Sequence, residues 1–382
     1  MLTRYTSSGG RVCKQALIYT LEEHGIKREN IDPDALRIIE RLNSAGFKAY
    51  LVGGAVRDLL LHKIPKDFDI VTNAEPQKIK KLFRNSRIIG KRFRLVHIFF
   101  GPKIFEVSTF RSSKDGSVGN VFGTMDEDVM RRDFTLNALY YDTAKQFIID
   151  YVGGVKDIKK KIVRPVISKK IIFKDDPVRM LRGVKYGASS DFKLQSSLSR
   201  LIKKQAFLLE PVSPSRLTEE LIKILNSGKA ARIISACSDH GLYMYLQPSA
   251  ADLMDSSKEF EKKYYDSLSE LDSIVSSSFE TRLGRKLTSL IDSFIDYIGF
   301  EETGDVQGIY YKVYRECRKF ILPINPPRVE LEYAVKFCLK KRGYKIPAKK
   351  RKPPVPVVNG KQGAELPKTS LEIPQKLPAP EF

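Results

Sequence analysis

Two aspartates separated by a single residue, Asp67 and Asp69, are the side chains in this sequence best suited to chemistry. The apolar residues around them predict a strand over Asp67–Val71, and alternate side chains of a strand point to the same face. Two carboxylates on one face repel each other unless a cation lies between them. Hard divalent cations prefer such oxygen ligands, and Mg²⁺ usually completes its coordination shell with substrate phosphates.

A glycine pair precedes these aspartates. Gly53 and Gly54 end the apolar run Ala49–Val52 and begin an amphipathic segment that predicts a helix. Glycine lets a phosphate approach the backbone closely, and the N–H groups at the start of a helix favour anions. A glycine pair alone is usually only a turn, and a lone Asp-x-Asp is usually solvated. In this order, with apolar strands on both sides, the two features indicate a metal-dependent nucleotidyl transfer site.

A third carboxylate, Glu106, lies on the predicted strand Ile104–Thr109. Its neighbours Phe105 and Val107 point to the opposite face, so Glu106 stands alone on its own face. It can join the two aspartates as a third group of the metal site. The alternative is an ordinary exposed strand residue.

The segment Arg131-Arg132-Asp133 follows a stretch rich in glycine, serine and aspartate, residues 112–126, that predicts a mobile loop. Asp133 can cap a helix over Asp133–Leu139. Alternatively, Asp133 accepts a hydrogen bond from a ribose hydroxyl while the two arginines bind phosphate oxygens. The tight reversal of charge favours this second interpretation.

Two further segments combine acidic and basic side chains at helical spacing. Asp176 and Arg179 are three residues apart and therefore share one helical face. Composition alone favours a capped helix with an exposed ion pair over base recognition. In the second segment, Ser213 predicts a helix cap, and Arg216 and Glu220 predict an i, i+4 ion pair.

The whole chain is basic. Its 382 residues carry a formal net charge of +22, which predicts a polyanionic partner. No apolar stretch approaches the ~20 residues that a membrane span requires, and the N-terminus lacks the features of a signal peptide. The four cysteines are scattered, which argues against zinc and a disulfide framework. We therefore expect a cytoplasmic protein that does not bind a membrane.

The pattern of apolar residues predicts an α+β protein in which helix-flanked strands form a small mixed sheet before a helical region. We expect a basic N-terminal arm over residues 1–30 with one helix near Lys14–Glu23, a sheet-containing head over 31–155, a helical neck over 156–230 and a helical body over 231–345. Residues 346–382 contain the basic cluster Lys349–Lys352 and repeated prolines, which predict a disordered tail.

These residues resemble the class II nucleotidyltransferases of the polymerase-β superfamily, which comprise bacterial poly(A) polymerases and CCA-adding enzymes. The motifs that carry the resemblance occur in family order over residues 50–220: Leu51-Val52-Gly53-Gly54-Ala55-Val56-Arg57-Asp58, Asp67-Phe68-Asp69, Glu106-Val107-Ser108-Thr109-Phe110-Arg111, Arg131-Arg132-Asp133-Phe134-Thr135-x-Asn137-Ala138, Asp176-Pro177-x-Arg179 and Ser213-x-x-Arg216-Leu217-x-x-Glu220.

The resemblance implies a polymerase-β-like head followed by helical domains. It implies that Asp67 and Asp69 hold two Mg²⁺ ions, with Glu106 or Asp133 as the assisting catalytic carboxylate. It also implies that Asp176 and Arg179 read the incoming base, which reverses the preference from composition. The nucleotide-binding residues that it implies are Gly53, Gly54, Arg57, Arg111, Arg132, Asp133, Asn137, Asp176, Arg179 and Arg182.

Within the family, the segment 88–98 and the basic, proline-rich tail resemble bacterial poly(A) polymerases. Three features depart from the family pattern: Asp175 replaces the usual glutamate, Gly183–Phe192 follows the neck helix only loosely, and the chain beyond about residue 230 matches little. These departures affect the choice of product more than the transfer reaction.

The resemblance therefore implies template-independent addition of AMP from ATP to RNA 3′ ends, with release of pyrophosphate, and tails that mark mRNA and other RNAs for decay. We expect a monomer that can also contact RNA-decay proteins. The alternative within the family is a CCA-adding enzyme acting on tRNA. The alternative from another class is a catalytically idle RNA-binding protein.

Overall fold

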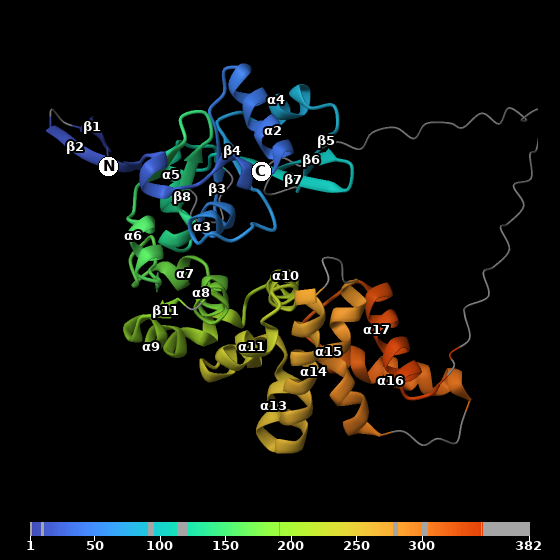
Figure 1. Ribbon diagram of the computed structural model, residues 1–382. Coiled ribbons are helices and arrows are strands. Elements are labelled where there is room, and N and C mark those ends of the chain that lie inside the picture. The colour runs from blue at the N-terminus through green and yellow to red at the C-terminus, as the bar shows by residue number, and fades with distance from the viewer. Residues whose placement is uncertain are drawn as a thin grey trace, which may run out of the picture. The chain divides into compact units, whose positions relative to one another are not determined.

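A computed structural model describes residues 2–8, 11–90, 95–112, 121–190, 192–277, 282–299, 305–344 and 346. A sheet with flanking helices occupies the chain up to Asp150, and helices dominate from Gly154 onward, as Figure 1 shows. The protein is therefore α+β, as the sequence predicted. The tail from residue 347, with its predicted basic cluster, lies outside the described residues, as do residues 91–94 of the segment 88–98.

The sheet of the head is mixed, in the order β1-β2-β9-β8-β3-β4-β7-β6-β5. All neighbouring strands are antiparallel except β4 and β7, which are parallel. The central strands β3, β4 and β7 carry the predicted site. The strands are β1 (Leu2–Ser8), β2 (Arg11–Tyr19), β3 (Ala49–Val52), β4 (Ile70–Thr72), β5 (Ser86–Ile89), β6 (Leu95–Phe100), β7 (Lys103–Thr109), β8 (Leu139–Asp142) and β9 (Phe147–Asp150).

Two helices, α2 (Pro33–Ser44) and α4 (Pro76–Leu82), pack on this sheet. The apolar side chains of α2 recur at helical spacing, so Ile38, Ile39 and Leu42 are fully buried in the core. Asp32 caps α2, because one of its carboxylate oxygens accepts a 2.8 Å hydrogen bond from the backbone N–H of Asp34.

The predicted helix near Lys14–Glu23 is wrong, because most of this segment belongs to strand β2. Leu17 and Ile18 pair with Asp150 and Ile149 of β9, and β1 pairs with the other edge of β2. A strand more than a hundred residues away therefore decides the local structure, and such tertiary pairing overrides weak helix propensity. A short helix, α1 (Leu21–His24), begins only after Thr20, which forms a capping box with Glu23.

The predicted helix over Asp133–Leu139 is also wrong. Only a short 3₁₀ turn, η2 (Thr135–Asn137), forms there, after the helix α5 (Met125–Met130). The Asp133 carbonyl oxygen accepts from Val166 N–H at 3.1 Å, and Thr135 N–H donates to the Arg164 carbonyl at 2.9 Å. The first of these bonds uses the Asp133 carbonyl oxygen, which a continuous α-helix would pair with the N–H of Asn137.

Helices make up nearly all the regular structure of the described chain after the head. Helix α8 packs against α10 and α11, and α15 packs against α14 and α17. None of the helices in the described ranges combines the length and apolarity needed to span a membrane. The elements are α6 (Gly154–Lys159), β10 (Ile162–Val163), α7 (Ile172–Asp175), α8 (Val178–Ser189), β11 (Lys193–Leu194), α9 (Ser196–Gln205), α10 (Pro214–Leu225), α11 (Ala230–Asp239), α12 (Tyr243–Leu246), α13 (Pro248–Ser256), α14 (Lys258–Ser277), α15 (Leu283–Ile298), α16 (Val306–Phe320) and α17 (Arg328–Lys341), with 3₁₀ turns at Arg28–Asn30 and Ala206–Leu209.

Candidate active site

The glycine pair forms the turn between β3 and α3 (Gly54–Leu60). Gly53 has φ = 69° and ψ = −132°, a backbone conformation that essentially only glycine adopts. A Cβ atom at Gly53 would lie 3.8 Å from Nη1 of Arg132 and 3.9 Å from Oδ2 of Asp69. The turn therefore exposes its backbone directly beside a cation and a carboxylate of the predicted site.

The two aspartates lie just before β4 rather than on it. The predicted strand Asp67–Val71 begins only at Ile70, because the partner strand β3 ends at Val52 where the glycine turn starts. The backbone of Asp69 is nevertheless aligned with β3, since its carbonyl oxygen accepts a 3.1 Å hydrogen bond from Val52 N–H. Both aspartates line one cavity of about 930 Å³, so the structure brings them together as the spacing predicted.

The carboxyl group of Asp69 has an unusual environment. Desolvation by the surrounding protein, together with the negative charges of Glu106 and Asp67, raises the pKa of Asp69 to about 6, although Arg132 and Lys223 oppose the rise. This concentration of negative charge would be relieved by a bound cation. Among the described residues, no group of three or more acidic, histidine or cysteine side chains forms a closed metal site. An ion held by the two aspartates therefore needs ligands from outside the protein, which suits Mg²⁺ with substrate phosphates and water.

Glu106 lies on β7 with the alternation that the sequence predicted: Phe105 and Val107 are buried on the other face. Its side chain is 56 % exposed, and Oε1 lies 3.4 Å from Nε2 of His97 on the neighbouring strand. Glu106 lines a smaller cavity that also contains Asp69, rather than the 930 Å³ cavity itself. Glu106 therefore shares with Asp69 the smaller cavity but not the larger one.

Arg132 is held beside the glycine turn by a buried network that sequence reasoning missed. Its Nη2 donates to Oδ2 of Asp128 at 3.0 Å, and its Nε donates to the Tyr140 hydroxyl at 2.9 Å. The Tyr140 hydroxyl donates in turn to Asp128 at 2.7 Å. Burial disfavours ionised Asp128, but Arg132, Tyr140 and Arg131 outweigh burial and lower the pKa of Asp128. The i, i+4 spacing of Asp128 and Arg132 was the available signal.

A second chain of contacts links the head to α8. Arg57 donates from Nη1 to Oδ1 of Asn137 at 2.7 Å, and Asn137 donates from Nδ2 to Oδ1 of Asp133 at 3.1 Å. Oδ2 of Asp133 lies 3.9 Å from Nη1 of Arg182. The guanidinium of Arg57 also lies over the ring of Tyr186. The predicted residues of three motifs are thus one connected group on the cavity wall.

Asp176 and Arg179 do not form the exposed ion pair that composition favoured. Arg179 is 2 % exposed, pairs with Asp175 at 2.9 Å and donates to the carbonyl oxygen of Arg131 at 2.8 Å. Both carboxylate oxygens of Asp176 accept from Nη2 of Arg216 at 2.9 Å. The carboxylate of Asp176 and the guanidinium of Arg179 thus both line the cavity. Arg216 holds the first, and Asp175 holds the second.

The predicted pair of Arg216 with Glu220 is wrong, because Glu220 is buried between α8 and α10 among three other cations. Arg182 donates to it at 2.9 Å, and the amines of Lys185 and Lys223 lie at 3.5 and 3.3 Å. Burial raises the pKa of a carboxyl group, but these three cations overcome that effect and lower the pKa of Glu220 to about 2. The Glu220 carboxylate therefore stays ionised and holds three cationic side chains that line the cavity.

Ser213 occupies the predicted position before α10, but its side chain makes no capping hydrogen bond to the helix backbone. Its hydroxyl lies 3.3 Å from that of Ser215 instead. This prediction is confirmed for position only.

The cavity gathers every predicted nucleotide-binding residue, and its volume falls in the range of about 300–1,000 Å³ typical of ligand sites. Nine cationic side chains and five carboxylates line it, so it suits a polyanion next to a metal. Sequence reasoning did not assign Lys185, Tyr186, Arg216 or Lys223 to it. The lining residues are Gly53, Gly54, Arg57, Asp67, Asp69, Leu95, Arg111, Arg131, Arg132, Asp133, Asn137, Asp176, Arg179, Arg182, Lys185, Tyr186, Ser189, Ser190, Arg216, Glu219, Lys223 and Ser227.

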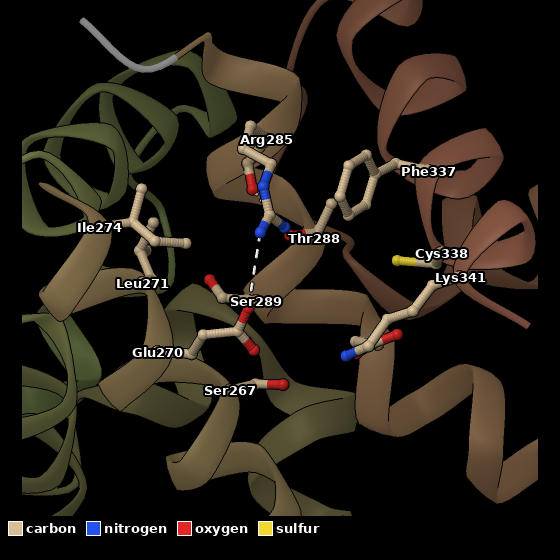
Figure 2. Close-up of a pocket in the computed structure, with 11 residues that line it drawn as sticks. Ser267, Glu270, Leu271, Ile274, Arg285, Thr288, Ser289, Phe337, Cys338 and Lys341 are labelled. Carbon is tan, nitrogen blue, oxygen red and sulfur yellow. Dashed lines mark hydrogen bonds and ion pairs between the residues drawn. The ribbon is translucent and has the colours of Figure 1, made fainter. Parts of the chain in front are cut away.

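Figure 2 shows a second cavity, of about 250 Å³, among α14, α15 and α17. The guanidinium of Arg285 lies 4.2 Å from the ring centre of Phe337, and Nη2 lies 3.4 Å from Glu270. The residues that line this cavity include neither a glycine turn nor a pair of aspartates. The larger cavity is therefore the candidate nucleotidyl transfer site.

Two family models match the chain. Residues 49–164 match the poly(A) polymerase head domain, and residues 191–254 match the probable RNA and SrmB-binding site of polymerase A. The chain is 42% identical over 251 residues to the poly(A) polymerase I of Escherichia coli O157:H7, which covers 62% of this chain and 54% of the relative. Over the matched residues the chain is similar to nucleotidyltransferases of the poly(A) polymerase and CCA-adding enzyme family. The resemblance seen in the sequence is thereby confirmed.

CCA-adding enzymes also match the chain. The enzyme of Lactobacillus helveticus is 37% identical over 196 residues, 50% of this chain and 49% of the relative. The chain thus spans about half the length of these curated relatives. The crystal structure of the Bacillus stearothermophilus CCA-adding enzyme with CTP superposes with a TM-score of 0.56 at 24% identity, covering 81% of this chain and 83% of the other. The structure of the Thermotoga maritima CCA-adding enzyme with tRNA superposes with a TM-score of 0.51 at 20% identity, covering 85% of each chain. These structures show the shared fold.

Proposed function

We propose that this protein is a polynucleotide adenylyltransferase, which adds AMP from ATP to RNA 3′ ends without a template. The RNA 3′ oxygen forms a bond to the α-phosphorus of ATP while the bond from that phosphorus to the bridging oxygen breaks. Pyrophosphate leaves, and the hydroxyl proton passes to solvent. The observation that carries the proposal is the pair Asp67 and Asp69 beside the Gly53 turn, in a cavity rich in cations.

Asp67 and Asp69 are the residues that would hold two Mg²⁺ ions. Bound metal would supply activation of the attacking hydroxyl and stabilisation of the leaving pyrophosphate. Glu106 is the better candidate for the assisting carboxylate, because its charge already acts on Asp69. Asp133 instead accepts from Asn137 and the backbone N–H of Phe134, which suits a residue that orients the nucleotide.

The triphosphate would lie between the glycine turn and the arginines around it. Gly53 leaves its backbone open to a phosphate, and Arg132 lies within reach of the same position. Arg111 and Arg131 line both cavities around Asp69. Fixed positive groups of this kind stabilise the charge that develops as pyrophosphate leaves.

Adenine would be read by Asp176 and Arg179. A carboxylate acceptor and a guanidinium donor can match the Watson–Crick edge of a base. Arg216 fixes both oxygens of Asp176, and Asp175 fixes Arg179, so the pair is held rigidly. Rigid polar groups discriminate well, because a mismatched base leaves them without partners.

Polyadenylation is favoured over CCA addition by the higher identity to poly(A) polymerase I, 42% against 37% for the CCA-adding enzyme. The segment 88–98 and the basic tail support the same choice. We further propose that the protein acts in the cytoplasm as a monomer, that its tails mark mRNA and other RNAs for decay, and that RNA-decay proteins contact it.

The product distribution tests this proposal. Purified protein is incubated with Mg²⁺, all four nucleoside triphosphates, and either a generic RNA or a tRNA that lacks its CCA end. We expect homopolymeric adenosine tails on both RNAs, with no stop after three additions. Ends reading CCA on the tRNA, with no extension of the generic RNA, would establish the alternative within the family. RNA binding without any incorporation would establish an idle RNA-binding protein.

A further inference from the structure

Three lysines from three distant parts of the chain gather where α10 ends. Lys66, in the loop before Asp67, donates from Nζ to the carbonyl oxygen of Asn226 at 3.1 Å. Lys286, in the first turn of α15, donates from Nζ to Oδ1 of Asn226 at 2.5 Å. Lys223 lies on α10 one turn before Asn226. The head, α10 and α15 therefore each bring one lysine to this place.

Lys223 pairs with Glu220 at 3.3 Å, but the charges of the other two lysines are poorly compensated. Within the described ranges, neither Lys66 nor Lys286 has a carboxylate at ion-pair distance, and their hydrogen bonds go to neutral oxygens of Asn226. Burial first, and the nearby charge of Lys66 second, lower the pKa of Lys286. Like charges held close together cost free energy unless an anion lies between them. The aspartate pair favours a bound cation, and by the same reasoning this lysine cluster favours a bound anion.

The position of the cluster identifies its anion. Lys66 directly precedes Asp67 in the chain. Lys223 and Ser227 line the same cavity as the aspartates. The triphosphate already has the glycine turn and the arginines near Arg132. The other polyanion that must reach Asp67 and Asp69 is the strand whose 3′ end is extended.

We propose that Lys66, Lys223 and Lys286 form a clamp for the phosphate backbone of the RNA strand near its 3′ end. The inference rests on the proposed function. Lysine ammonium groups are point charges without the planar fork of arginine, so they grip phosphates without reading bases. Such a grip suits an enzyme that extends RNAs of varied sequence. The clamp also explains why Lys223 of α10 and Lys286 of α15 lie near Lys66 in the loop before Asp67.

A purely structural role, in which the lysines tie the head to the helical region through Asn226, gives different results. Glutamine at Lys66 and Lys286 keeps a hydrogen-bond donor but removes the charge. Alanine at Asn226 removes the hydrogen bond from Lys286 but keeps both lysine charges, and the bond from Lys66 to the backbone carbonyl stays. A clamp makes RNA binding sensitive to the first change and leaves the salt dependence of binding unaltered by the second.

The experiment measures the Kd of a 5′-fluorescein oligoribonucleotide by anisotropy at several salt concentrations, and KM for RNA and for ATP, with the full chain. For Lys66→Gln/Lys286→Gln we expect about tenfold weaker RNA binding, a KM for ATP within about twofold, and a slope of log affinity against log salt smaller by about 1.4 for two lost contacts. Arginine at both positions should restore most of the affinity. Lys262→Gln/Lys312→Gln, which removes two exposed lysines on α14 and α16, is the matched control.

A slope and Kd equal to those of the control double variant would overturn the clamp. An equal loss in Asn226→Ala would also overturn it, in favour of the structural tie. If the wild-type protein binds RNA but incorporates no AMP, the proposed function fails while the binding measurements still decide whether the clamp exists.

Discussion

Asp128 and Arg132 are joined by a 3.0 Å ion pair beneath the glycine turn, and the Tyr140 hydroxyl completes the group. Asp128 is only 5 % exposed, so its charge depends on these partners. The guanidinium that it holds lies beside both Gly53 and Asp69. In the proposed function, Asp128 would act on the nucleotide through Arg132 as a positioning residue.

Asp128→Asn should weaken ATP binding more than RNA binding. The amide still accepts a hydrogen bond, but Arg132 loses its fixed counter-charge and its position. We expect KM for ATP to rise about tenfold, about 1.4 kcal/mol, with KM for RNA within twofold. Steady-state kinetics with each substrate varied in turn checks this. Tyr140→Phe, which removes one hydrogen bond of the same group, should have a smaller effect; equal rises in both KM values would argue for general loosening of the fold.

Asp69 should titrate near pH 6 in the metal-free protein, well above an ordinary aspartate. The sign follows from the charges around it: because its pKa is raised in the folded protein, ionised Asp69 opposes folding as pH rises through about 6. Asp69→Asn should therefore increase stability at pH 7. The Asp69 carboxyl is open to solvent in the cavity, so screening reduces the stability gained by Asp69→Asn to about 1 kcal/mol. This gain corresponds to a rise in Tm of roughly 2–4 °C.

Glu106→Gln tests the cause of this shift. Removing the charge of Glu106 should lower the pKa of Asp69, as measured by carbon-13 NMR of the metal-free protein. Asp255→Asn, a change at an exposed aspartate of α13, is the control and should leave the value in place. A pKa of Asp69 near 4 in the wild-type protein would refute this electrostatic description of the site.

Base selection should depend on the pair Asp176 and Arg216. Arg216→Lys keeps the charge but cannot hold both oxygens of Asp176 in the same way. We expect the preference for ATP over CTP to fall about tenfold, with a smaller loss in the rate with ATP. Competition assays with mixed nucleotides measure this ratio. An unchanged ratio in a slower enzyme would place base reading elsewhere.

The parts of this site that lie close together in the sequence were predictable. Gly53 and Asp69 are short-range signals, because a glycine turn and an Asp-x-Asp segment beside apolar strands report their own local structure. Glu106 followed from strand alternation. Asp128 offered only its i, i+4 spacing to Arg132 as a signal. The pairing of Glu220 with Arg182 and Lys185 could not be found this way, since it depends on which helices meet in the folded chain.

The same distinction explains the errors in the fold. The cap of α2 at Asp32 is a local feature, because it depends only on the neighbouring residue Asp34. The strand β2 was mistaken for a helix because its pairing partner, β9, lies more than a hundred residues away. The helix expected at Asp133 fails because the Asp133 carbonyl oxygen accepts from the N–H of Val166 instead.

The central claim is that Asp67 and Asp69 make this cavity a metal-dependent adenylyl transfer site. The most direct measurement is incorporation of radiolabelled AMP into RNA by the wild-type protein, Asp67→Ala and Asp69→Ala, with Mg²⁺ or with a chelator, after circular dichroism has shown that each variant is folded. Losing a metal ligand removes several kcal/mol of stabilisation, so we expect at least a ~10³-fold lower rate in either variant and none in chelator. Asp255→Ala should match the wild type. Activity within a few-fold of wild type in either folded aspartate variant would contradict the assignment.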